Sequence, residues 1–191
     1  MEEKYVDSLD ELEHGYKEYL VVKVNTDKKF IIMKRLFDIV GSSLGLILLS
    51  PVFLVLFVLM KIENVKAPFF FSQDRIGKHK GTFRMYKIRS MCPDAEEKLE
   101  ELLAFNEVQG AMFKMKEDPR ITKIGKFIRK YSIDELPQLW NVLKGDMSLV
   151  GPRPPLPREV DTYSRYDCNR LLVKPGCTGL WQISGRNDVG F

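Results

Sequence analysis

The longest uncharged stretch of the chain runs from Ile39 to Met60 and reads IVGSSLGLILLSPVFLVLFVLM. As a straight α-helix that rises about 1.5 Å per residue, it would extend about 33 Å, which is enough to cross a bilayer. Pro51 disturbs this path because it cannot donate to the carbonyl of Ile47 and its ring clashes with a straight helix. The Ser50 hydroxyl can satisfy part of the backbone that Pro51 frees. The stretch is therefore predicted to be a membrane element with a break at Ser50-Pro51.

Basic residues flank the apolar stretch on both sides. Lys34 and Arg35 precede it, and Lys61 and Lys66 follow it. Positive charge at both ends is expected when both ends stay in the cytoplasm. We therefore predict a helix that enters the membrane, breaks and returns to the same face, with arms about 16 Å long. A kinked spanning helix and a buried helix of a soluble domain are the alternatives.

Three charged residues at the start of the stretch are expected at the membrane interface. Asp38 lies three residues after Arg35, a spacing that suits an ion pair. Lys34 and Arg35 serve either as anchors among lipid headgroups or as ligands of a lipid phosphate.

The rest of the composition is that of a globular protein, with 191 residues, 45% of them apolar and 29% charged. This length predicts one main folding unit. Cys92, Cys168 and Cys177 are odd in number and lack a C-x-x-C spacing, which favours a reducing compartment. His14 and His79 have no cysteine or second histidine at ligand spacing, so neither a zinc site nor a histidine-based triad is expected. Carboxylates, lysines and arginines must therefore carry any catalysis.

The formal net charge of +4 is unevenly distributed, because the start of the chain is acidic and the basic residues gather after position 60. This basic part predicts an anionic partner: nucleic acid, lipid headgroups or a phosphorylated small substrate. No recognisable nucleic-acid module is present, so we do not expect nucleic acid as a partner.

Local patterns divide the chain into a variable leader over 1–30, the membrane hairpin over 31–62 and a cytoplasmic domain over 63–191. In that domain APFFFSQDRIG and GTFRMYKIRSM predict two strands around a turn, and DAEEKLEELLAFNEV predicts a helix. The predicted fold class is α+β: a re-entrant helix-break-helix hairpin joined to a small mixed domain with amphipathic surface helices.

Two further helices are predicted by apolar spacing. Ile121, Ile124, Ile128 and Tyr131 share one face of a helix whose other faces are basic, a pattern typical of a membrane surface or of a solvated surface helix. The next helix carries an apolar stripe and ends at Lys144-Gly145. The stripe consists of Leu136, Leu139, Trp140 and Leu143.

The pattern Ser, aliphatic, Asp, Glu, Leu occurs twice, at Ser8 and at Ser132. The first copy lies in an acidic run that would repel a phosphorylated substrate, so it is interpreted as a helix cap. The second copy, in SIDELP, also fits a capping box between Ser132 and Glu135, with Pro137 near the helix start. A purely structural role for the second copy therefore stays open.

The surroundings of the second copy favour chemistry. Carboxylates in the first turn of a helix face unpaired N–H groups, which also attract phosphate oxygens. Arg129 precedes the acids and Arg153 follows them in GPRP, so a carboxylate here stays ionised and can attack phosphorus. Adjacent helical residues point about 100° apart. One of Asp134 and Glu135 can therefore attack while the other holds a divalent cation.

Five segments together resemble a known family. KRLFD, the central Ser-Pro of the apolar stretch, YKIRSM, SIDELPQLWNVLKGDMSLVGPRP and KPGCTGLWQISGRND occur in the order typical of the monotopic polyprenol-phosphate phosphoglycosyl transferases. These bacterial sugar transferases begin the assembly of exopolysaccharides, capsules and glycoprotein glycans. The resemblance covers residues 32 to 191.

The resemblance implies a two-step reaction at the cytoplasmic face of the bacterial inner membrane. Asp134 would attack a UDP-sugar, release UMP and carry the phosphosugar until polyprenol phosphate accepts it. Glu135 matches the acid that binds Mg²⁺, and Arg129 and Arg153 match arginines that contact phosphate or nucleotide. Such a displacement needs a metal and arginines to neutralise oxygen charge more than it needs a strong base.

Further residues of the matching segments are candidates for the site. Lys87 and Arg89 in YKIRSM could contact phosphate or lie on the surface of an edge strand. Trp181 and Gln182 could line a sugar pocket, although an aromatic in a strand is more often core. Arg186 is another candidate for the site.

The expected partners are a UDP-sugar, polyprenyl phosphate and membrane lipids. The insertion AFNEVQGAMFKMKEDPRIT resembles members that transfer glucose-1-phosphate or galactose-1-phosphate, with N-acetylhexosamine-1-phosphate as the alternative. The resemblance also leads us to expect further residues after Phe191, so that the chain is C-terminally truncated. The competing hypothesis is a membrane-anchored binding protein whose acids only cap helices.

Overall fold

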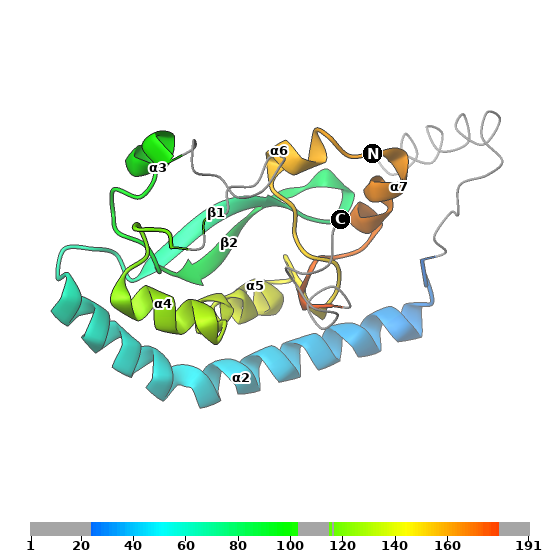
Figure 1. Ribbon diagram of the computed structural model, residues 1–191. Coiled ribbons are helices and arrows are strands. Elements are labelled where there is room, and N and C mark those ends of the chain that lie inside the picture. The colour runs from blue at the N-terminus through cyan, green and yellow to red at the C-terminus, as the bar shows by residue number, and fades with distance from the viewer. Residues whose placement is uncertain (1–23, 103–114, 116, 180–191) are drawn as a thin grey trace.

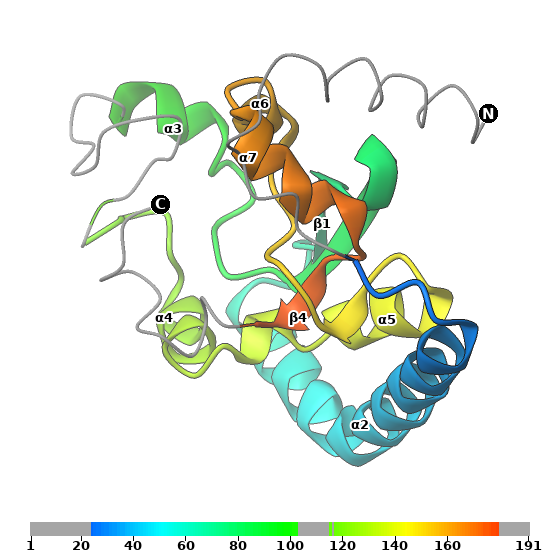
Figure 2. The same cartoon turned by 90° about the vertical axis from the view of Figure 1, so that its right-hand side faces the viewer.

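The computed structural model describes residues 24–102, 115 and 117–179 (Figure 1). The predicted leader therefore lies mostly outside the described residues. Helix α2 spans Lys28–Glu63 and forms one side of the molecule. Figures 1 and 2 show α4 and α5 above α2, with the β1–β2 hairpin on their other side. Helices and strands are both present, as predicted.

Helix α2 stays helical through Pro51, so the structure has a bend where the sequence predicted a break between two helices (Figures 1 and 2). The Ser50 hydroxyl donates to the carbonyl of Ile47 at 2.8 Å, which confirms how the backbone freed by Pro51 is satisfied. In the described part of the chain, this is the one helix long and apolar enough to cross a membrane. Only 11% of its most apolar window is buried, which argues against the core helix of a soluble domain.

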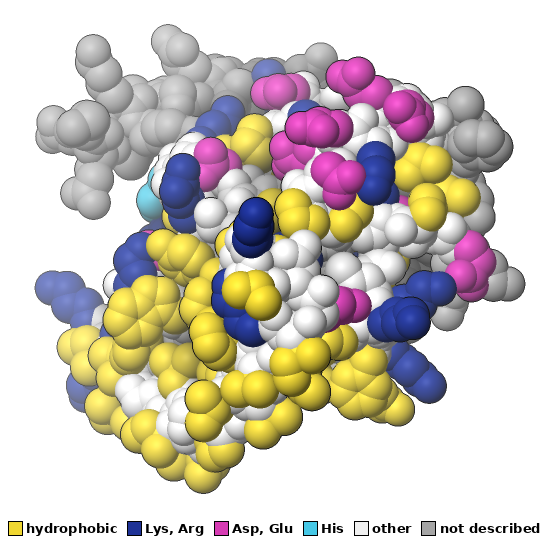
Figure 3. Space-filling model, turned by 90° about the vertical axis from the view of Figure 1, so that its left-hand side faces the viewer, with side chains coloured by type: hydrophobic (Ala, Val, Ile, Leu, Met, Phe, Trp, Pro, Cys, Tyr) yellow, Lys and Arg dark blue, Asp and Glu magenta, His cyan; other side chains and the backbone are white. Residues whose placement is uncertain are grey.

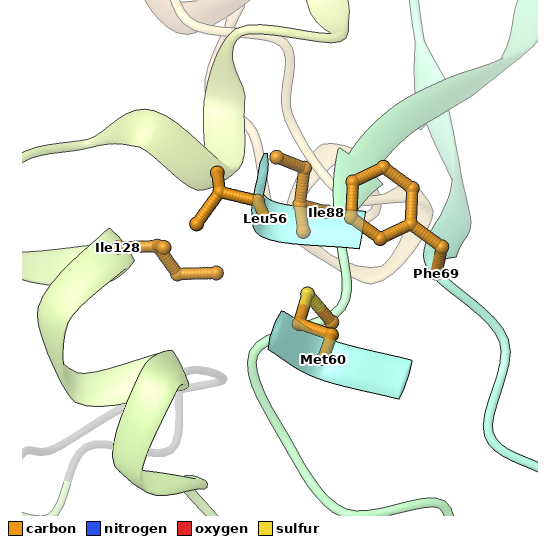
Figure 4. Close-up of a cluster of buried hydrophobic side chains, with 5 residues drawn as sticks. All are labelled: Leu56, Met60, Phe69, Ile88 and Ile128. Atoms are coloured by element: carbon orange, nitrogen blue, oxygen red, sulfur yellow. The ribbon is translucent and has the colours of Figure 1, made fainter. Parts of the chain in front are cut away.

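The two arms of α2 contact different parts of the same domain. In the first arm, Gly41 and Gly45 allow close approach, because a side-chain carbon there would lie 2.7 Å from Leu149 and 2.9 Å from Leu139. In the second arm, two side chains complete an apolar core with residues from the hairpin and α4 (Figure 4). That core consists of Leu56, Met60, Phe69, Ile88 and Ile128.

The predicted strand pair is confirmed. Strands β1 (Phe70–Ile76) and β2 (Thr82–Ile88) are antiparallel, with Phe70 opposite Ile88. The turn between them holds His79 and Lys80 at φ values of 54° and 61°, the left-handed region. Met85 and Ile88 of β2 are both buried, but they lie three residues apart and therefore on opposite faces of the strand. Ile88 belongs to the core beside α2, and Met85 packs in a second cluster with Val142 and Met147.

The remaining described elements are short and follow one another around the hairpin. They are α3 (Glu97–Leu102), α4 (Lys123–Lys130), η3 (Ile133–Glu135), α5 (Gln138–Lys144), β3 (Ser148–Val150), α6 (Pro157–Val160), α7 (Arg165–Cys168), η4 (Asn169–Leu172) and β4 (Gly176–Thr178), with η1 (Lys78–Lys80) in the hairpin turn. Strands β3 and β4 pair in parallel. Their backbones approach so closely at Gly151 and Gly176 that a side-chain carbon on Gly176 would overlap Gly151.

Both predicted helices after residue 120 exist, but their apolar faces differ from the prediction. Ile128 of α4 is fully buried, whereas Tyr131 beyond its end is 58% exposed and stacks at a tilt on exposed Phe127. The isoleucine face of α4 therefore packs inward and is not a membrane-facing stripe. In α5, Trp140 is half exposed and Val142 takes its place in the core. Gly145 ends α5 at φ 98°, as predicted.

Candidate active site

Asp134 and Glu135 lie in η3, a single turn just before α5. Ser132 precedes them in a left-handed conformation, with φ 56°, and its side chain makes no capping hydrogen bond. Pro137 occupies the N-cap of α5, as expected near a helix start. The Ser132 side chain therefore does not cap this turn, as the capping-box alternative would require.

Asp134 is buried, with 7% of its surface exposed, whereas Glu135 is part-exposed. Lys87 reaches over from β2 and its Nζ donates to Glu135 Oε1 at 2.9 Å. Burial raises the pKa of the Asp134 carboxyl; the positive charges of Lys87 and Arg129 oppose this shift, and Glu135 adds to it. The structure thus brings both acids together with Lys87 and Arg129.

Arg153 follows β3 in the Gly151–Pro154 segment and forms an ion pair with Glu159 of α6 at 3.0 Å. The N–H of Leu156 donates to the same carboxylate at 2.9 Å. Burial works to raise the pKa of Glu159, yet the Leu156 N–H and Arg153 hold it below its usual range. Arg153 is therefore held by a carboxylate that stays ionised.

Arg75 is a residue that sequence reasoning missed. It lies in β1, is 7% exposed, and shares electrostatic interactions with Arg153, Glu159 and Glu135. In the sequence it counted only as one of the charges that follow the apolar stretch. Its available signal was strand alternation, which places Arg75 on the same face of β1 as Phe71 and Gln73, and the pairing sets Phe71 and Gln73 opposite Lys87 and Met85 of β2.

Arg89 is held by backbone carbonyls at the end of β2. Its Nε donates to the carbonyl of Pro68 at 2.7 Å and its Nη1 to that of Met91 at 2.6 Å, and the side chain is buried. These bonds tie the end of β2 to the chain before β1 and after β2. A phosphate contact by Arg89 stays a prediction. The hydrogen bonds of its side chain to backbone carbonyls do not favour it.

The predicted interface residues of α2 bind the protein itself. Arg35 donates to the carbonyls of Val142 and Leu143 at 2.6 and 2.7 Å, so it does not pair with Asp38 as predicted. Asp38 is buried and accepts from Ser148 Oγ and Leu149 N, both at 3.0 Å. The physical reason is the packing of α2 on α5: Arg35 reaches the last carbonyls of α5, which have no partner within that helix, and Lys34 takes the place beside Asp38.

Lys34 completes this contact between α2 and β3. Its Nζ lies 4.0 Å from Asp38 Oδ1 and donates to Ser148 Oγ and to the carbonyl of Val150. Asp38 therefore has Lys34, one turn earlier, as its ionic partner.

Magnesium was predicted at Glu135. No cluster of three or more metal-ligating side chains occurs among residues 24–102, 115 and 117–179. Two adjacent carboxylates still fit Mg²⁺, because this ion is commonly held by one or two carboxylates while substrate phosphates and water complete its shell. Trp181, Gln182 and Arg186 lie outside the described residues.

The fold and these side chains define a class: a small α+β domain joined to a bent apolar helix, with a carboxylate pair among cations that suit a phosphorylated ligand. The chain belongs to the bacterial sugar transferase family, whose model, described as "Bacterial sugar transferase", matches residues 29–191.

Curated relatives agree with this assignment. "Galactosyl transferase CpsE" of Streptococcus agalactiae serotype III is 54% identical over 159 residues, which cover 83% of this chain and 35% of the relative. "Undecaprenyl-phosphate galactose phosphotransferase" of Salmonella typhimurium is 50% identical over 163 residues, 83% of this chain and 34% of the relative. "Exopolysaccharide production protein ExoY" of Rhizobium meliloti is 43% identical, over 83% of this chain and 71% of the relative. This chain thus spans about a third of the length of the first two relatives.

Proposed function

We propose that the chain is a phosphoglycosyl transferase that moves hexose-1-phosphate, galactose-1-phosphate or glucose-1-phosphate, from a UDP-sugar to polyprenyl phosphate. The observation that carries this proposal is the buried Asp134 carboxylate beside Glu135, flanked by Lys87 and Arg129. Two relatives named for galactose transfer to a lipid carrier favour galactose. The reaction would begin exopolysaccharide or capsule synthesis.

In the proposed first step, an oxygen of Asp134 attacks the phosphorus that bears the sugar. The bond from this phosphorus to the bridging oxygen breaks, and UMP leaves with that oxygen. In the second step, an oxygen of polyprenyl phosphate attacks the same phosphorus and displaces Asp134, which yields polyprenyl diphosphate sugar. A carboxylate suits this role because it attacks as the anion and needs no base to deprotonate it.

The neighbouring residues act mainly on charge. Lys87 favours the ionised form of Asp134 and holds Glu135, while Arg129 and Arg153 supply positive charge for phosphate oxygens. Glu135 would hold Mg²⁺, which neutralises charge on the diphosphate when bound. The raised pKa of Asp134 makes this assistance necessary, because the protonated carboxyl is a poor nucleophile.

The membrane arrangement proposed is re-entrant, with the domain at the cytoplasmic face. It is supported by the bend at Pro51, by the contacts of both arms of α2 with one domain and by basic residues at both ends. Figure 3 shows hydrophobic side chains gathered at the lower side of the molecule, where α2 lies, and carboxylates at the upper side. A helix that crossed the membrane would carry its two ends to opposite faces.

The test is UMP release from UDP-galactose by the full chain in lipid nanodiscs with Mg²⁺ and undecaprenyl phosphate. Asp134→Asn is expected to reduce turnover by about 10³-fold or more, as loss of a nucleophile does. Asp161→Asn, which changes an exposed carboxylate, is the matched control and should keep wild-type turnover. Without the acceptor, a hexose phosphate should be found by mass spectrometry on the peptide that contains residue 134.

UDP-glucose and UDP-N-acetylhexosamines, tested in parallel, identify the sugar. If Asp134→Asn turned over at the wild-type rate, the proposal that Asp134 is the nucleophile would be refuted. Binding of anionic lipid without release of UMP from any of these donors would support a binding protein instead.

A further inference from the structure

Arg75 couples β1 to the segment that carries Arg153. Its Nη1 donates to the carbonyl of Pro154 at 3.1 Å and its Nη2 to Gln73 Oε1 at 2.8 Å. The next residue, Ile76, donates its N–H to the carbonyl of Pro155 at 3.0 Å. The end of β1 therefore binds the chain at Pro154 and Pro155, directly after Arg153, which is the residue proposed to contact phosphate.

The charge of Arg75 exceeds what this structural contact requires. A carbonyl can be held by a neutral donor, and burying a guanidinium away from water is costly. Its Nε is buried and has no hydrogen-bond partner among the described residues, and the same is true of Glu159 Oε1. Two buried polar atoms of opposite character are thus left unsatisfied beside the Arg153–Glu159 ion pair.

The local charges leave an excess of positive charge. The pKa of Arg75 is lowered to about 10, first by burial and then by the positive charge of Arg153, while the negative charges of Glu159 and Glu135 oppose this shift. Glu159 is already bound to Arg153, and Glu135 to Lys87. The site therefore gathers four cations, Arg75, Lys87, Arg129 and Arg153, and three carboxylates, Asp134, Glu135 and Glu159, so that an arriving anion would offset the excess positive charge.

We propose that Arg75 is a positioning residue of the active site, which clamps the Arg153 segment through Pro154 and adds its positive charge to the site for the substrate diphosphate. This inference rests on the proposed function, since the diphosphate belongs to the UDP-sugar. Arg75 acts through Arg153, so no direct contact with the reacting atoms is required.

Two substitutions separate the clamp from the charge. Arg75→Gln removes the charge and keeps one donor, whereas Arg75→Lys keeps the charge and cannot hold Pro154 and Gln73 together with the same geometry. Arg84→Gln is the matched control, because Arg84 lies on the partner strand with its side chain 73% exposed and 3.9 Å from Asp74.

The measurements are KM and kcat for UDP-galactose and the equilibrium affinity for UDP, all with the full chain in nanodiscs. For Arg75→Gln we expect about a ten-fold rise in KM and a matching loss of UDP affinity, with a smaller change in kcat. Arg75→Lys should show a smaller rise in KM, and Arg84→Gln none. The effects of Arg75→Gln and Arg153→Gln should be non-additive in the double variant, because they act on one segment.

Several results would overturn the proposal. These are an unchanged KM and UDP affinity in Arg75→Gln, additivity with Arg153→Gln, or a loss of kcat that matches the loss of folded protein at constant KM. If Arg75→Gln does not fold, Arg75→Lys decides, and a wild-type KM there refutes the clamp. If the wild-type chain releases no UMP, the proposed function fails, while the UDP affinities of the two variants still decide the role of Arg75.

Discussion

Asn141 links α5, the helix that follows Asp134 and Glu135, to strand β2, and its removal should lower the free energy of unfolding. It is fully buried in α5, and its Oδ1 accepts from the N–H of Tyr86 at 3.1 Å. Its Nδ2 donates to the carbonyl of Arg84 at 2.7 Å and to Asp146 Oδ2 at 3.1 Å. One side chain thus provides hydrogen-bond partners for two backbone groups on the edge of β2 that does not pair with β1.

Asn141→Ala would leave the backbone groups of Tyr86 and Arg84 without their partner. A stranded buried group costs about 1–3 kcal/mol, and the lower half of this range applies because both bonds are only part-buried. With the lost bond to Asp146, the free energy of unfolding should fall by about 3 kcal/mol. For a chain of this size, the melting temperature should fall by about 6–12 °C.

The assay is thermal unfolding in detergent micelles together with hydrogen exchange at the amide of Tyr86. Lys144→Ala is the control: it removes the exposed partner of Asp146, whose Oδ2 lies 3.0 Å from Lys144 Nζ, and should cost less than about 1 kcal/mol. A melting temperature of Asn141→Ala within about 2 °C of the wild type, with the Tyr86 amide still protected, would show that water replaces the side chain and that the reasoning is wrong.

Three further outcomes are expected. Lys87→Met should move the acid limb of the kcat/KM profile to higher pH, because the charge of Lys87 lowers the pKa of Asp134; an unmoved limb would exclude this electrostatic role. Cys177, whose thiol has a pKa raised to about 12 by burial and then by the negative charge of Glu135, should resist iodoacetamide at pH 8 until the protein unfolds, and mass spectrometry of its peptide would reveal any equal labelling of folded protein. Cysteines placed at exposed Asn25 and Asn64 should both be shielded from an impermeant maleimide in intact cells and both react in inverted vesicles, whereas labelling of one end in cells would show a spanning helix.

Features set by neighbours in sequence were predicted well. The β1–β2 hairpin follows from alternating polarity, and Gly145 ends α5 because glycine adopts φ 98° without strain. The Ser50 bond to Ile47 is also local, since a hydroxyl can reach the carbonyl of the preceding turn. In each case residues close to one another along the chain were sufficient.

Features set by distant contacts were missed or misassigned. Arg75 became part of the site only through Pro154, 79 residues later. Tyr131 was expected on the same helix face as Ile128, but α4 ends at Lys130 and the chain turns before the tyrosine could continue that face. Helical spacing indicates which residues share a face only while the helix continues.

The residues of KRLFD connect the membrane helix to the chemistry more directly than interface anchors would. Arg35 binds the carbonyl end of α5, whose other end follows Asp134 and Glu135 almost at once. Asp38 binds Ser148 and Leu149 of β3, and β3 leads directly to Arg153. The first arm of α2 therefore fixes both segments that supply the carboxylates and the arginine. A shift of this arm would therefore move both segments together and keep the carboxylates and the arginine in the same arrangement.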